Sequence, residues 1–464
     1  MLRIFRHYIP KTLVLLGLTE LLILFASIYL GASFEVSNGE RTSFGADGVP
    51  LWCQAVAFAA AIVLGMTAMG LYQRDQHTLP GAVMLRLVLS FVCGFVVMGT
   101  LYLMVPALIV GGAIFATALV CSFVGIATCR LLCANGEEGY DANRVLILGA
   151  GECAKQIENL KAASTNRGLV IAGYLHHGSD APCVKAEHLV RIDAGQSLRE
   201  LAEALDVDEI VVAPDDRRKS LPVEQILECK MYGIRILQAA DFFERQLGKI
   251  RLDTLHPSNV IFADGFTQAV IKSYEKRILD VVVSAAMILA TLPVILATAI
   301  AIYLESGGPV LYRQERVGRR GRVFTLLKFR SMRQDAEANG AVWALQNDSR
   351  VTRVGSFIRK TRIDELPQLL NVLKGDMSFV GPRPERPQFV AELSKAIPYY
   401  DLRHYVKPGI TGWAQILYPY GASINDAREK LQYDLYYLKN YSIFLDINIV
   451  LQTMQVILWG KGAR

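Results

Sequence analysis

Two neighbouring carboxylates within a basic segment are the side chains of this sequence best suited to chemistry. Asp364 and Glu365 lie in the segment 347–386, and they open a predicted amphipathic helix with Pro367 in its first turn. The apolar side of that helix includes Leu366, Leu369, Leu370 and Leu373. The cations around the pair are Arg350, Arg353, Arg359, Lys360 and Arg362. A carboxylate at a helix N-terminus beside cations is expected to have a depressed pKa, as a nucleophile attacking phosphorus needs.

Two rigid turns that follow favour a functional interpretation of this pair. A Thr-x-x-Asp-Glu helix start is usually a capping pattern, and on the pair alone that alternative stays open. The turn at 381–385 (Gly-Pro-Arg-Pro-Glu) presents Arg383, and the loop at 407–412 (Lys-Pro-Gly-Ile-Thr-Gly) begins with Lys407. Because Pro and Gly fix the backbone shape, such cationic loops suit a diphosphate or a uracil. Glu365 is a candidate ligand for Mg²⁺, which would neutralise a diphosphate and stabilise a leaving phosphate.

The composition indicates a protein embedded in a membrane. The chain has 464 residues, of which 52% are hydrophobic and 20% are charged, whereas a soluble domain carries about a quarter charged residues. The same numbers exclude a disordered chain, a collagen-like repeat and a small disulfide scaffold. Residues 271–464 contain 27 Lys and Arg against 17 Asp and Glu. A basic region attached to a membrane suits anionic lipid head groups or phosphorylated substrates.

Cysteine and histidine chemistry is disfavoured in the C-terminal part of the chain. All eight cysteines precede residue 230 and none has a Cys-x-x-Cys partner, so neither a zinc knuckle nor a redox motif is predicted. After His256 the sequence contains one histidine, His404. Chemistry in this part must therefore use carboxylates and cations.

The N-terminal part is predicted to hold four transmembrane helices. Apolar stretches at 12–33, 51–72, 84–106 and 107–129 are each about as long as the ~20 residues that a spanning helix needs. We expect the first to be a retained helix rather than a cleaved signal peptide. By the positive-inside rule, the basic flanks place the N-terminus and everything after Arg130 in the cytoplasm.

A sequence with α/β character follows from Arg144. Short apolar runs at 145–148, 169–174, 209–212 and 234–237 are predicted strands, with helices at 197–205 and 222–231 between them. This alternation predicts a parallel sheet in a Rossmann-like, doubly wound domain. A Gly-x-Gly-x-x-Ala turn at 149–154 could place a phosphate at a helix N-terminus, but no acidic residue closes the second strand. We therefore favour a structural or regulatory domain over a cofactor-binding one.

A further apolar run, 281–303, has strongly basic flanks on both sides. The positive-inside rule then asks for both flanks to be cytoplasmic, which a straight spanning helix cannot satisfy. Pro293 lies in the middle of the run, where it removes a backbone donor and bends or breaks the helix. We predict a re-entrant membrane helix over 279–304; the alternative is a fifth spanning helix.

The predicted fold is thus membrane α plus α/β in three parts. A four-helix transmembrane bundle covers 1–142, and the Rossmann-like cytoplasmic domain covers 143–262. An α-rich catalytic domain with the Pro-broken re-entrant helix covers 263–464.

Four motifs in this order resemble those of the large bacterial phosphoglycosyl transferases. These are polyprenyl-phosphate hexose-1-phosphate transferases that prime exopolysaccharide and O-antigen synthesis, and the resemblance covers the entire chain. The motifs are Lys276-Arg277-Ile278-Leu279-Asp280, Asp364-Glu365-Leu366-Pro367-Gln368, Val380-Gly381-Pro382-Arg383-Pro384 and Lys407-Pro408-Gly409-Ile410-Thr411-Gly412. Relatives often have Ser before the helix-breaking proline, where this chain has Leu292.

The resemblance implies a two-step reaction. Asp364 would attack the sugar-bearing phosphate of a UDP-sugar, UMP would leave, and undecaprenyl phosphate would then take the sugar phosphate from Asp364. Glu365 would assist through Mg²⁺. Residues implied at the substrates are Lys276, Arg277 and Asp280 in the motif at the membrane surface, Arg383 at the nucleotide, and Arg350, Arg353 and Lys407 at phosphates.

The same resemblance sets the expected partners and location. They are a UDP-sugar, undecaprenyl phosphate, Mg²⁺ and membrane lipids, with no nucleic acid. We expect a homodimer in the bacterial inner membrane, multi-pass, with the catalytic domain facing the cytoplasm. The particular sugar is not legible from the sequence.

Two features near the C-terminus are interpreted less specifically. Asp434 either contributes to the substrate site or forms a surface salt bridge. The apolar helical stretch 443–459 is short for a span, and we expect it to lie on the membrane or to pack on a partner.

Two other functions compete with the transferase. A membrane-bound nucleotide-sugar dehydratase needs a Tyr-x-x-x-Lys pair, and no tyrosine here has lysine four positions later. A non-catalytic scaffold of polysaccharide assembly is opposed only by the intact Asp364-Glu365 pair and its cations.

Overall fold

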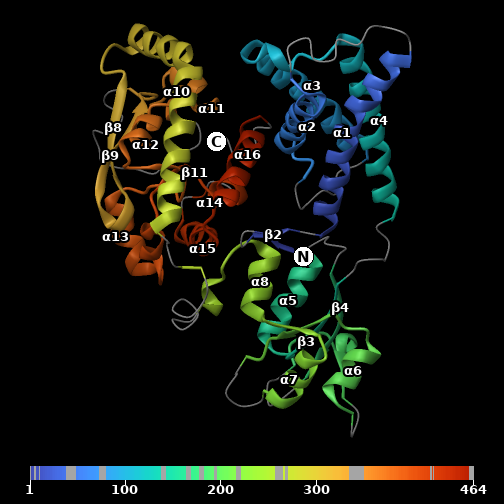
Figure 1. Ribbon diagram of the computed structural model, residues 1–464. Coiled ribbons are helices and arrows are strands. Elements are labelled where there is room, and N and C mark those ends of the chain that lie inside the picture. The colour runs from blue at the N-terminus through green and yellow to red at the C-terminus, as the bar shows by residue number, and fades with distance from the viewer. Residues whose placement is uncertain are drawn as a thin grey trace. The chain divides into compact units, whose positions relative to one another are not determined.

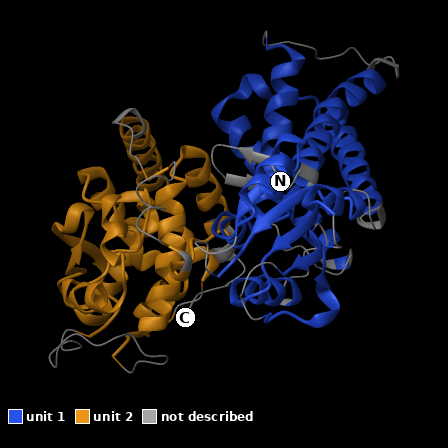
Figure 2. Ribbon diagram, turned by 90° about the horizontal axis from the view of Figure 1, so that it is seen from below, with its two compact units in different colours: residues 1, 9–247 blue, residues 2–8, 248–464 orange. Residues whose placement is uncertain are grey.

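The computed structural model describes residues 2–4, 7–9, 11–37, 49–72, 80–136, 143–163, 169–176, 182–192, 196–215, 221–255, 265–266, 270–333, 350–418, 421 and 423–458. The chain divides into two compact units, residues 1 and 9–247 and residues 2–8 and 248–464 (Figure 2). Both predicted domain boundaries, at 142/143 and 262/263, touch residues outside the described ranges. A short pair of strands, β1 (Leu2–Ile4) and β2 (His7–Ile9), opens the chain.

Four long apolar helices make up the N-terminal part of the first unit (Figure 1). They are α1 (Lys11–Ser37), α2 (Leu51–Ala68), α3 (Pro80–Met104) and α4 (Gly112–Gly136), with the 3₁₀ helix η1 (Pro106–Leu108) before α4. Leu24, Phe58 and Ile62 are fully buried among them, whereas Leu15 and Leu22 of α1 are 65% and 64% exposed. Apolar side chains on an outer helix face fit contact with lipid. Together with α10 below, five helices of the described chain are long and apolar enough to cross a membrane.

A buried ion pair joins the first and fourth of these helices. Arg130 Nε lies 2.6 Å from Glu20 Oε1, and Arg130 Nη2 donates to Glu20 Oε2 at 3.1 Å. The hydroxyl of Tyr72 donates to the same carboxylate at 2.6 Å. Charged side chains in an apolar bundle are costly unless paired, so this contact fixes α1 against α4.

A five-stranded parallel sheet forms the other part of the first unit. Its order is β5-β4-β3-β6-β7, and all neighbouring strands pair in parallel. The strands are β3 (Asn143–Leu148), β4 (Leu169–Leu175), β5 (Leu189–Val190), β6 (Glu209–Val212) and β7 (Arg235–Gln238). The four predicted strands are confirmed; β5, only two residues long, was not predicted.

Helices cover both faces of this sheet. They are α5 (Glu152–Ala163), α6 (Leu198–Ala204), α7 (Val223–Met231) and α8 (Ala239–Leu247), with η2 (Ala186–His188) before β5. Val145 and Ile147 of β3 are buried with α5 and α8, whereas Leu146 and Leu148 are buried with α6 and α7. Alternate residues of a strand point to opposite faces, which explains why β3 is an unbroken apolar run.

The second unit contains all the residues predicted to do chemistry. After η3 (Leu252–Thr254) and α10 (Val270–Ser306) comes an antiparallel hairpin of β8 (Leu311–Val317) and β9 (Val323–Phe329), joined through η4 (Arg319–Gly321). The elements that follow are α11 (Arg353–Lys360), η5 (Ile363–Glu365), α12 (Gln368–Lys374), β10 (Ser378–Val380), α13 (Pro387–Ala396), η6 (Tyr400–Tyr405), β11 (Gly409–Thr411), α14 (Trp413–Leu417), α15 (Ile424–Lys439) and α16 (Ile443–Leu458). Strands β10 and β11 pair in parallel.

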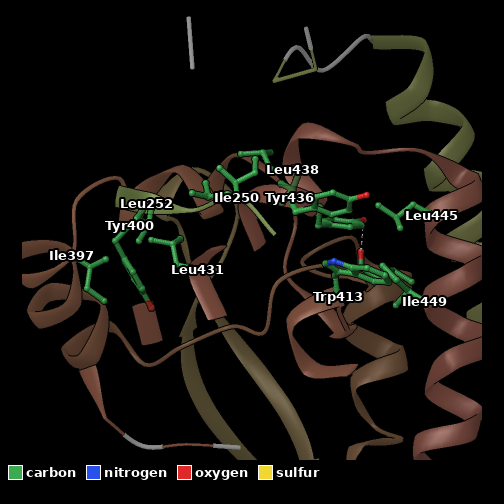
Figure 3. Packing of buried hydrophobic residues seen from close by; sticks show 14 of the residues in the cluster. Ile250, Leu252, Ile397, Tyr400, Trp413, Leu431, Tyr436, Leu438, Leu445 and Ile449 are labelled. Atoms are coloured by element: carbon green, nitrogen blue, oxygen red, sulfur yellow. Dashed lines mark hydrogen bonds between the residues drawn. The ribbon is translucent and has the colours of Figure 1, made fainter. Parts of the chain in front are cut away.

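An aromatic core holds the C-terminal helices of this unit together (Figure 3). Trp413 stacks on Tyr436 with ring centroids 5.8 Å apart, and its indole N–H donates to the Gly248 carbonyl at 2.8 Å. Leu445 and Ile449 of α16 are fully buried in the same core. The prediction that 443–459 lies on a membrane or on a partner is thus wrong for this face of the helix. Leu445 and Ile449 complete the core of their own unit, whereas Ile447 of the same helix is 48% exposed.

Helix α10 differs from the predicted helix–break–helix. It begins at Val270, nine residues before the predicted start, and continues through Pro293 as one helix that bends in Figure 1. The Thr291 hydroxyl donates to the Met287 carbonyl at 2.6 Å, a contact that often bends helices. Proline removes one backbone bond and bends the helix, while the remaining bonds keep the turns on either side helical.

Both ends of α10 are attached to the second unit, and its middle is exposed. Near the start, the Asp280 carboxylate accepts from Ser378 Oγ and Phe379 N. At the far end, the Glu305 carboxylate accepts from the backbone N–H groups of Arg353 and Val354, at 2.9 and 3.1 Å. Between these ends, large apolar side chains are exposed: Leu289, Leu292, Leu296, Ile300 and Leu304.

Candidate active site

The two carboxylates lie in a 3₁₀ turn that packs against α10, β9 and α11. Arg362, with a left-handed φ of 60°, leads into η5, which contains Asp364 and Glu365. Ile363 and Leu366 pack against a buried cluster of Ile302 from α10, Phe329 from β9 and Ile358 from α11. Pro367 is the N-cap of α12 rather than a residue of its first turn. The prediction that the pair opens this helix is therefore wrong by one turn.

Glu365 is held by three cations. Its Oε1 atom lies 3.1 Å from Lys328 Nζ, 3.0 Å from Arg383 Nη2 and 3.8 Å from Arg362 Nη1. The side chain is only 11% exposed. Burial alone would raise the pKa of Glu365, but Lys328, Arg383 and Arg362 together hold that pKa well below its usual range. These cations therefore favour the anionic form of Glu365, which in turn positions them around the turn.

Asp364 has the opposite electrostatic environment. Burial raises the pKa of Asp364, the anionic Glu365 raises it further, and Lys328, Arg383 and Arg362 lower it without restoring the usual value. The expectation of a depressed pKa at this position is therefore wrong. Two adjacent carboxylates whose pKa values move apart are typical of a site in which they perform different tasks.

A buried charge pair fixes the loop that carries Arg383. Arg403 Nη2 lies 2.8 Å from Asp434 Oδ2 and donates to the Arg383 carbonyl at 3.0 Å. From the hairpin, Arg316 Nη1 donates to the Pro384 carbonyl at 2.9 Å. Burial raises the pKa of Asp434 to about 6, against the effect of Arg403. Asp434, predicted at the substrate or at the surface, is buried and acts through Arg403 on the position of the loop.

Three cations of this site were missed from the sequence. Lys328 and Arg316 come from the β8–β9 hairpin, and Arg403 comes from η6. A lysine in an apolar strand, as in the Lys328 segment Val-Phe-Thr-Leu-Leu-Lys-Phe, was the available signal for the first. The other two showed no local pattern, because their contacts join segments far apart in the sequence.

The motif at the start of α10 is engaged in internal contacts. Lys276 Nζ donates to Asp446 Oδ2 at 2.6 Å and is buried. The Arg277 guanidinium donates to the carbonyls of Val372 and Leu373, at 2.5 and 2.6 Å, at the C-terminus of α12. Asp280, as described above, binds the start of β10. These contacts position α10 against α12, α16 and β10, and the predicted substrate contact of the three residues gains no support from them.

The contacts described for the remaining predicted phosphate ligands are with other elements. The backbone of Arg353 contacts Glu305, and the carbonyl of Arg350 accepts from Arg333 N at 2.9 Å. Lys407 lies beside Gly375, at the end of α12 opposite the carboxylates. Arg383 is thus the one predicted phosphate or nucleotide residue that the described contacts place at the pair.

The donor set of the turn fits Mg²⁺ only together with a substrate. No group of three or more His, Cys, Asp or Glu side chains suited to a metal occurs among the described residues. Mg²⁺ is commonly held by one or two carboxylates together with phosphate oxygens and water. Asp364 and the second carboxylate oxygen of Glu365 fit this pattern, because all three cations contact Glu365 through Oε1.

The glycine turn of the sheet, where the sequence favours a structural role over cofactor binding, is occupied by a side chain of the same chain. The N–H groups of Glu152 and Cys153 at the start of α5 donate to the Asp215 carboxylate at 2.8 and 2.9 Å. A Cβ atom on Gly151 would lie 2.1 Å from Asp215 Oδ2. The position where a dinucleotide phosphate would bind is therefore filled by a side chain of the same chain.

Comparison with known proteins agrees with the arrangement in the second unit. The family model "Bacterial sugar transferase" matches residues 271–460. The chain is 33% identical over 340 residues to the UDP-glucose:undecaprenyl-phosphate glucose-1-phosphate transferase of Xanthomonas campestris pv. campestris, covering 70% of this chain and 69% of that protein. This chain belongs to the bacterial sugar transferase family.

Two further relatives also have names of undecaprenyl-phosphate sugar transferases, and one of these names has N-acetylgalactosamine in place of glucose. One is the UDP-N-acetylgalactosamine-undecaprenyl-phosphate N-acetylgalactosaminephosphotransferase of Aeromonas hydrophila, 45% identical over 239 residues, 52% of this chain and 56% of the relative. The other is the UDP-glucose:undecaprenyl-phosphate glucose-1-phosphate transferase of Escherichia coli (strain K12), 43% identical over 181 residues, 39% of each chain. The match thus spans about half of the first relative and less of the second.

Proposed function

We propose that this chain transfers hexose-1-phosphate from a UDP-sugar to undecaprenyl phosphate and so primes exopolysaccharide synthesis. The observation that carries this is the pairing of Asp364, whose pKa is raised, with Glu365, which is held anionic by Lys328, Arg383 and Arg362. The cations that balance Glu365 are also suited to a diphosphate at the same turn.

The reaction proceeds in two displacements at one phosphorus atom. An Asp364 carboxylate oxygen attacks the sugar-bearing phosphorus, the bond from that phosphorus to the UMP oxygen breaks, and UMP leaves with the electron pair. A phosphate oxygen of undecaprenyl phosphate then attacks the same phosphorus, and the Asp364 oxygen leaves as a carboxylate. The product is undecaprenyl-diphospho-sugar, and the enzyme is restored.

The cations of the turn act on the charge of the donor. Arg383, fixed through its carbonyl by Arg403, is placed to contact the diphosphate, and Lys328 neutralises charge beside Asp364. Mg²⁺, bound by Asp364 and Glu365 with the diphosphate, would neutralise the leaving phosphate. The names of the relatives, which include a UDP-sugar and undecaprenyl phosphate, support these substrates.

In this proposal the second unit lies at the cytoplasmic side of the bacterial inner membrane. Helix α10 enters the bilayer and returns on the same side, which agrees with the attachment of both its ends to one unit and with its exposed apolar middle. The four N-terminal helices form the transmembrane bundle, and the five-stranded sheet forms a Rossmann-like domain with a structural or regulatory role. A homodimer through the apolar N-terminal surface completes the proposal.

Release of UMP tests the proposal directly. The purified, lipid-reconstituted protein is incubated with Mg²⁺, undecaprenyl phosphate and a panel of UDP-sugars, beside the variants Asp364→Asn and Asp401→Asn. Asp401 is an exposed carboxylate of the same unit that binds Ser394, so it controls for the loss of one charge. Release with one sugar, lost only in Asp364→Asn, names the donor. No release with any sugar from folded protein would favour the scaffold function instead.

A further inference from the structure

A basic pocket lies in the second unit, away from the carboxylate turn. It has a volume of about 380 Å³ and is open to solvent. The hairpin connection supplies three of its cations and the loop before β11 supplies the fourth: Arg319, Arg320, Arg322 and Lys407. Gly375 and Asp376, directly after α12, complete the part of the lining that matters here.

This pocket and the carboxylate turn lie at opposite ends of two elements. Asp364 and Glu365 precede α12, whereas Gly375 and Asp376 follow it. On β9, Lys328 contacts Glu365, whereas Phe324 lines the pocket. Four residues of extended strand separate Phe324 from Lys328, about 13 Å. One phosphate group cannot contact both sites.

The lining of the pocket contains four cations and one acidic side chain. Among the described residues, no ion pair involves Arg320, Arg322 or Lys407. The one acidic residue in the lining, Asp376, lies 2.9 Å from Lys374. Burial lowers the pKa of the half-buried Lys407, and the neighbouring Arg277 and Arg319 lower it further, while Asp280 and Asp376 offset part of this effect. Cations that repel one another in a shared pocket are stabilised by a bound anion.

The glycine at position 375 leaves room for Lys407 and Arg277 to approach each other. Its φ is 99°, and a Cβ atom there would lie 3.5 Å from Arg277 Nη2 and 3.7 Å from Lys407 Nζ. Arg277 is already fixed by the carbonyls of Val372 and Leu373. The ammonium of Lys407 is therefore held beside a fixed guanidinium at the edge of the pocket.

The same edge borders an exposed apolar surface. Arg277 lies on α10 directly before Ile278, which is 66% exposed, and Val282, about one turn after Ile278, is 59% exposed. An anion that reaches Lys407 along this edge can carry apolar chains that lie against α10. This arrangement is typical of a lipid phosphate and not of a soluble nucleotide.

We propose that the pocket of Arg319, Arg320, Arg322 and Lys407 binds the phosphate head group of an anionic membrane lipid, separately from the substrates at Asp364. Phosphate oxygens accept from the guanidinium and ammonium groups, and the acyl chains lie on the exposed face of α10 near Ile278 and Val282. The bound lipid would attach the hairpin end of the second unit to the bilayer surface.

Native mass spectrometry of the full chain in detergent tests this site. The protein is titrated with dihexanoyl phosphatidic acid, dihexanoyl phosphatidylcholine and inorganic phosphate. We expect an apparent Kd for phosphatidic acid at least about tenfold lower than that for either other probe, as several charge-assisted hydrogen bonds would give. The double variant Arg322→Ala/Lys407→Ala should raise the phosphatidic acid Kd about tenfold.

Matched variants distinguish lipid binding at this pocket from a general effect of positive charge on lipid binding. Arg428→Ala/Lys395→Ala removes the same charges from exposed positions outside the pocket and should change Kd less than about twofold. Arg320→Ala/Arg322→Ala, both exposed on the hairpin end, repeats the test without touching the partly buried Lys407. Equal loss in the control, or no preference for phosphatidic acid over phosphatidylcholine, would overturn the proposal. Equal affinity for inorganic phosphate would overturn the lipid source. The readout needs no turnover, so it stands apart from the proposed reaction.

Discussion

The sequence offers two positions for a phosphate, the glycine turn of the sheet, where we favour a structural role, and the carboxylate turn of the second unit. The two turns have opposite structures. At the glycine turn, the donors of α5 are satisfied by Asp215 from the same chain. At the carboxylate turn, cations gather around Glu365 while Asp364 has a raised pKa. A phosphate motif is therefore informative only once its donors and charges have been counted in three dimensions.

The difference has a physical basis. Backbone N–H groups at a helix start need acceptors, and the two oxygens of Asp215 accept from Glu152 N and Cys153 N, one each. Three cations around one carboxylate leave an excess of positive charge, which can bind a further anion. At the glycine turn, a residue of the same chain occupies the donors. At the carboxylate turn, the cations are arranged to bind a ligand.

The largest expected effect separates the two regions by activity. Asp364→Asn should reduce UMP release by at least about 10³-fold, because the amide cannot act as the nucleophile. Asp215→Asn should change it less than about twofold, because Asp215 only satisfies backbone donors. The two rates are compared with the same donor in reconstituted protein. A comparable loss in Asp215→Asn would break the contrast and give the sheet domain a part in turnover.

The next effect concerns the buried pair that fixes the Arg383 loop. Asp434→Leu leaves the Arg403 charge buried and unpaired, which should cost about 3–5 kcal/mol of stability. We expect a clear fall in the melting temperature of the full chain in detergent, and loss of UMP release at low temperature as well. The double variant Arg403→Met/Asp434→Leu should recover most of the stability but not the activity. Full recovery of activity would show that Arg403 does not position the loop.

A pH profile distinguishes the electrostatic roles of the two carboxylates. The pKa of Asp364 is raised, so UMP release should fall, as pH decreases, at a higher pH than an ordinary aspartate would give. Lys328 lowers this pKa, so Lys328→Met should move the acidic limb to still higher pH. Lys360→Met, on an exposed position of α11, is the control. An unshifted limb in Lys328→Met would contradict the assignment of that limb to Asp364.

Glu365 stabilises the folded chain through its charged form, so its contribution depends on pH. Its folded pKa is lower than its ordinary value, so its contribution is present above the ordinary pKa and is lost as pH falls through the folded value. Glu365→Gln should therefore lower the melting temperature at neutral pH by more than at acidic pH. Equal losses at both pH values would show that its anionic form is not what stabilises the turn.

The smallest effect is expected at the glycine turn. Asp215→Ala exposes two backbone donors to water and should cost about 0.5–1 kcal/mol, in the range of a lost helix cap. The change is measured as a small decrease in melting temperature, with Asp401→Ala for comparison. A much larger decrease would mean that Asp215 supports more of the sheet than its two hydrogen bonds indicate.

Local patterns determined much of this protein from its sequence. The apolar segments, the alternation of strands and helices from Arg144 onward, the Asp364-Glu365 pair and the rigid loop of Arg383 all depend on residues close in sequence. Hydrophobic period, segment length and Pro or Gly content encode such features directly. For this reason the four principal strands and the membrane-like helices were predicted near their observed positions.

Only the tertiary structure decided the electrostatics. Lys328 reaches Glu365 from a strand 37 residues earlier, and Arg403 meets Asp434 across 31 residues. Three further features need distant segments to meet. They are the burial that raises the pKa of Asp364, the ion pair of Lys276 with Asp446, and the position of Asp215 at the glycine turn. Charge interactions depend on distance and burial in space, and neither quantity is carried by local sequence.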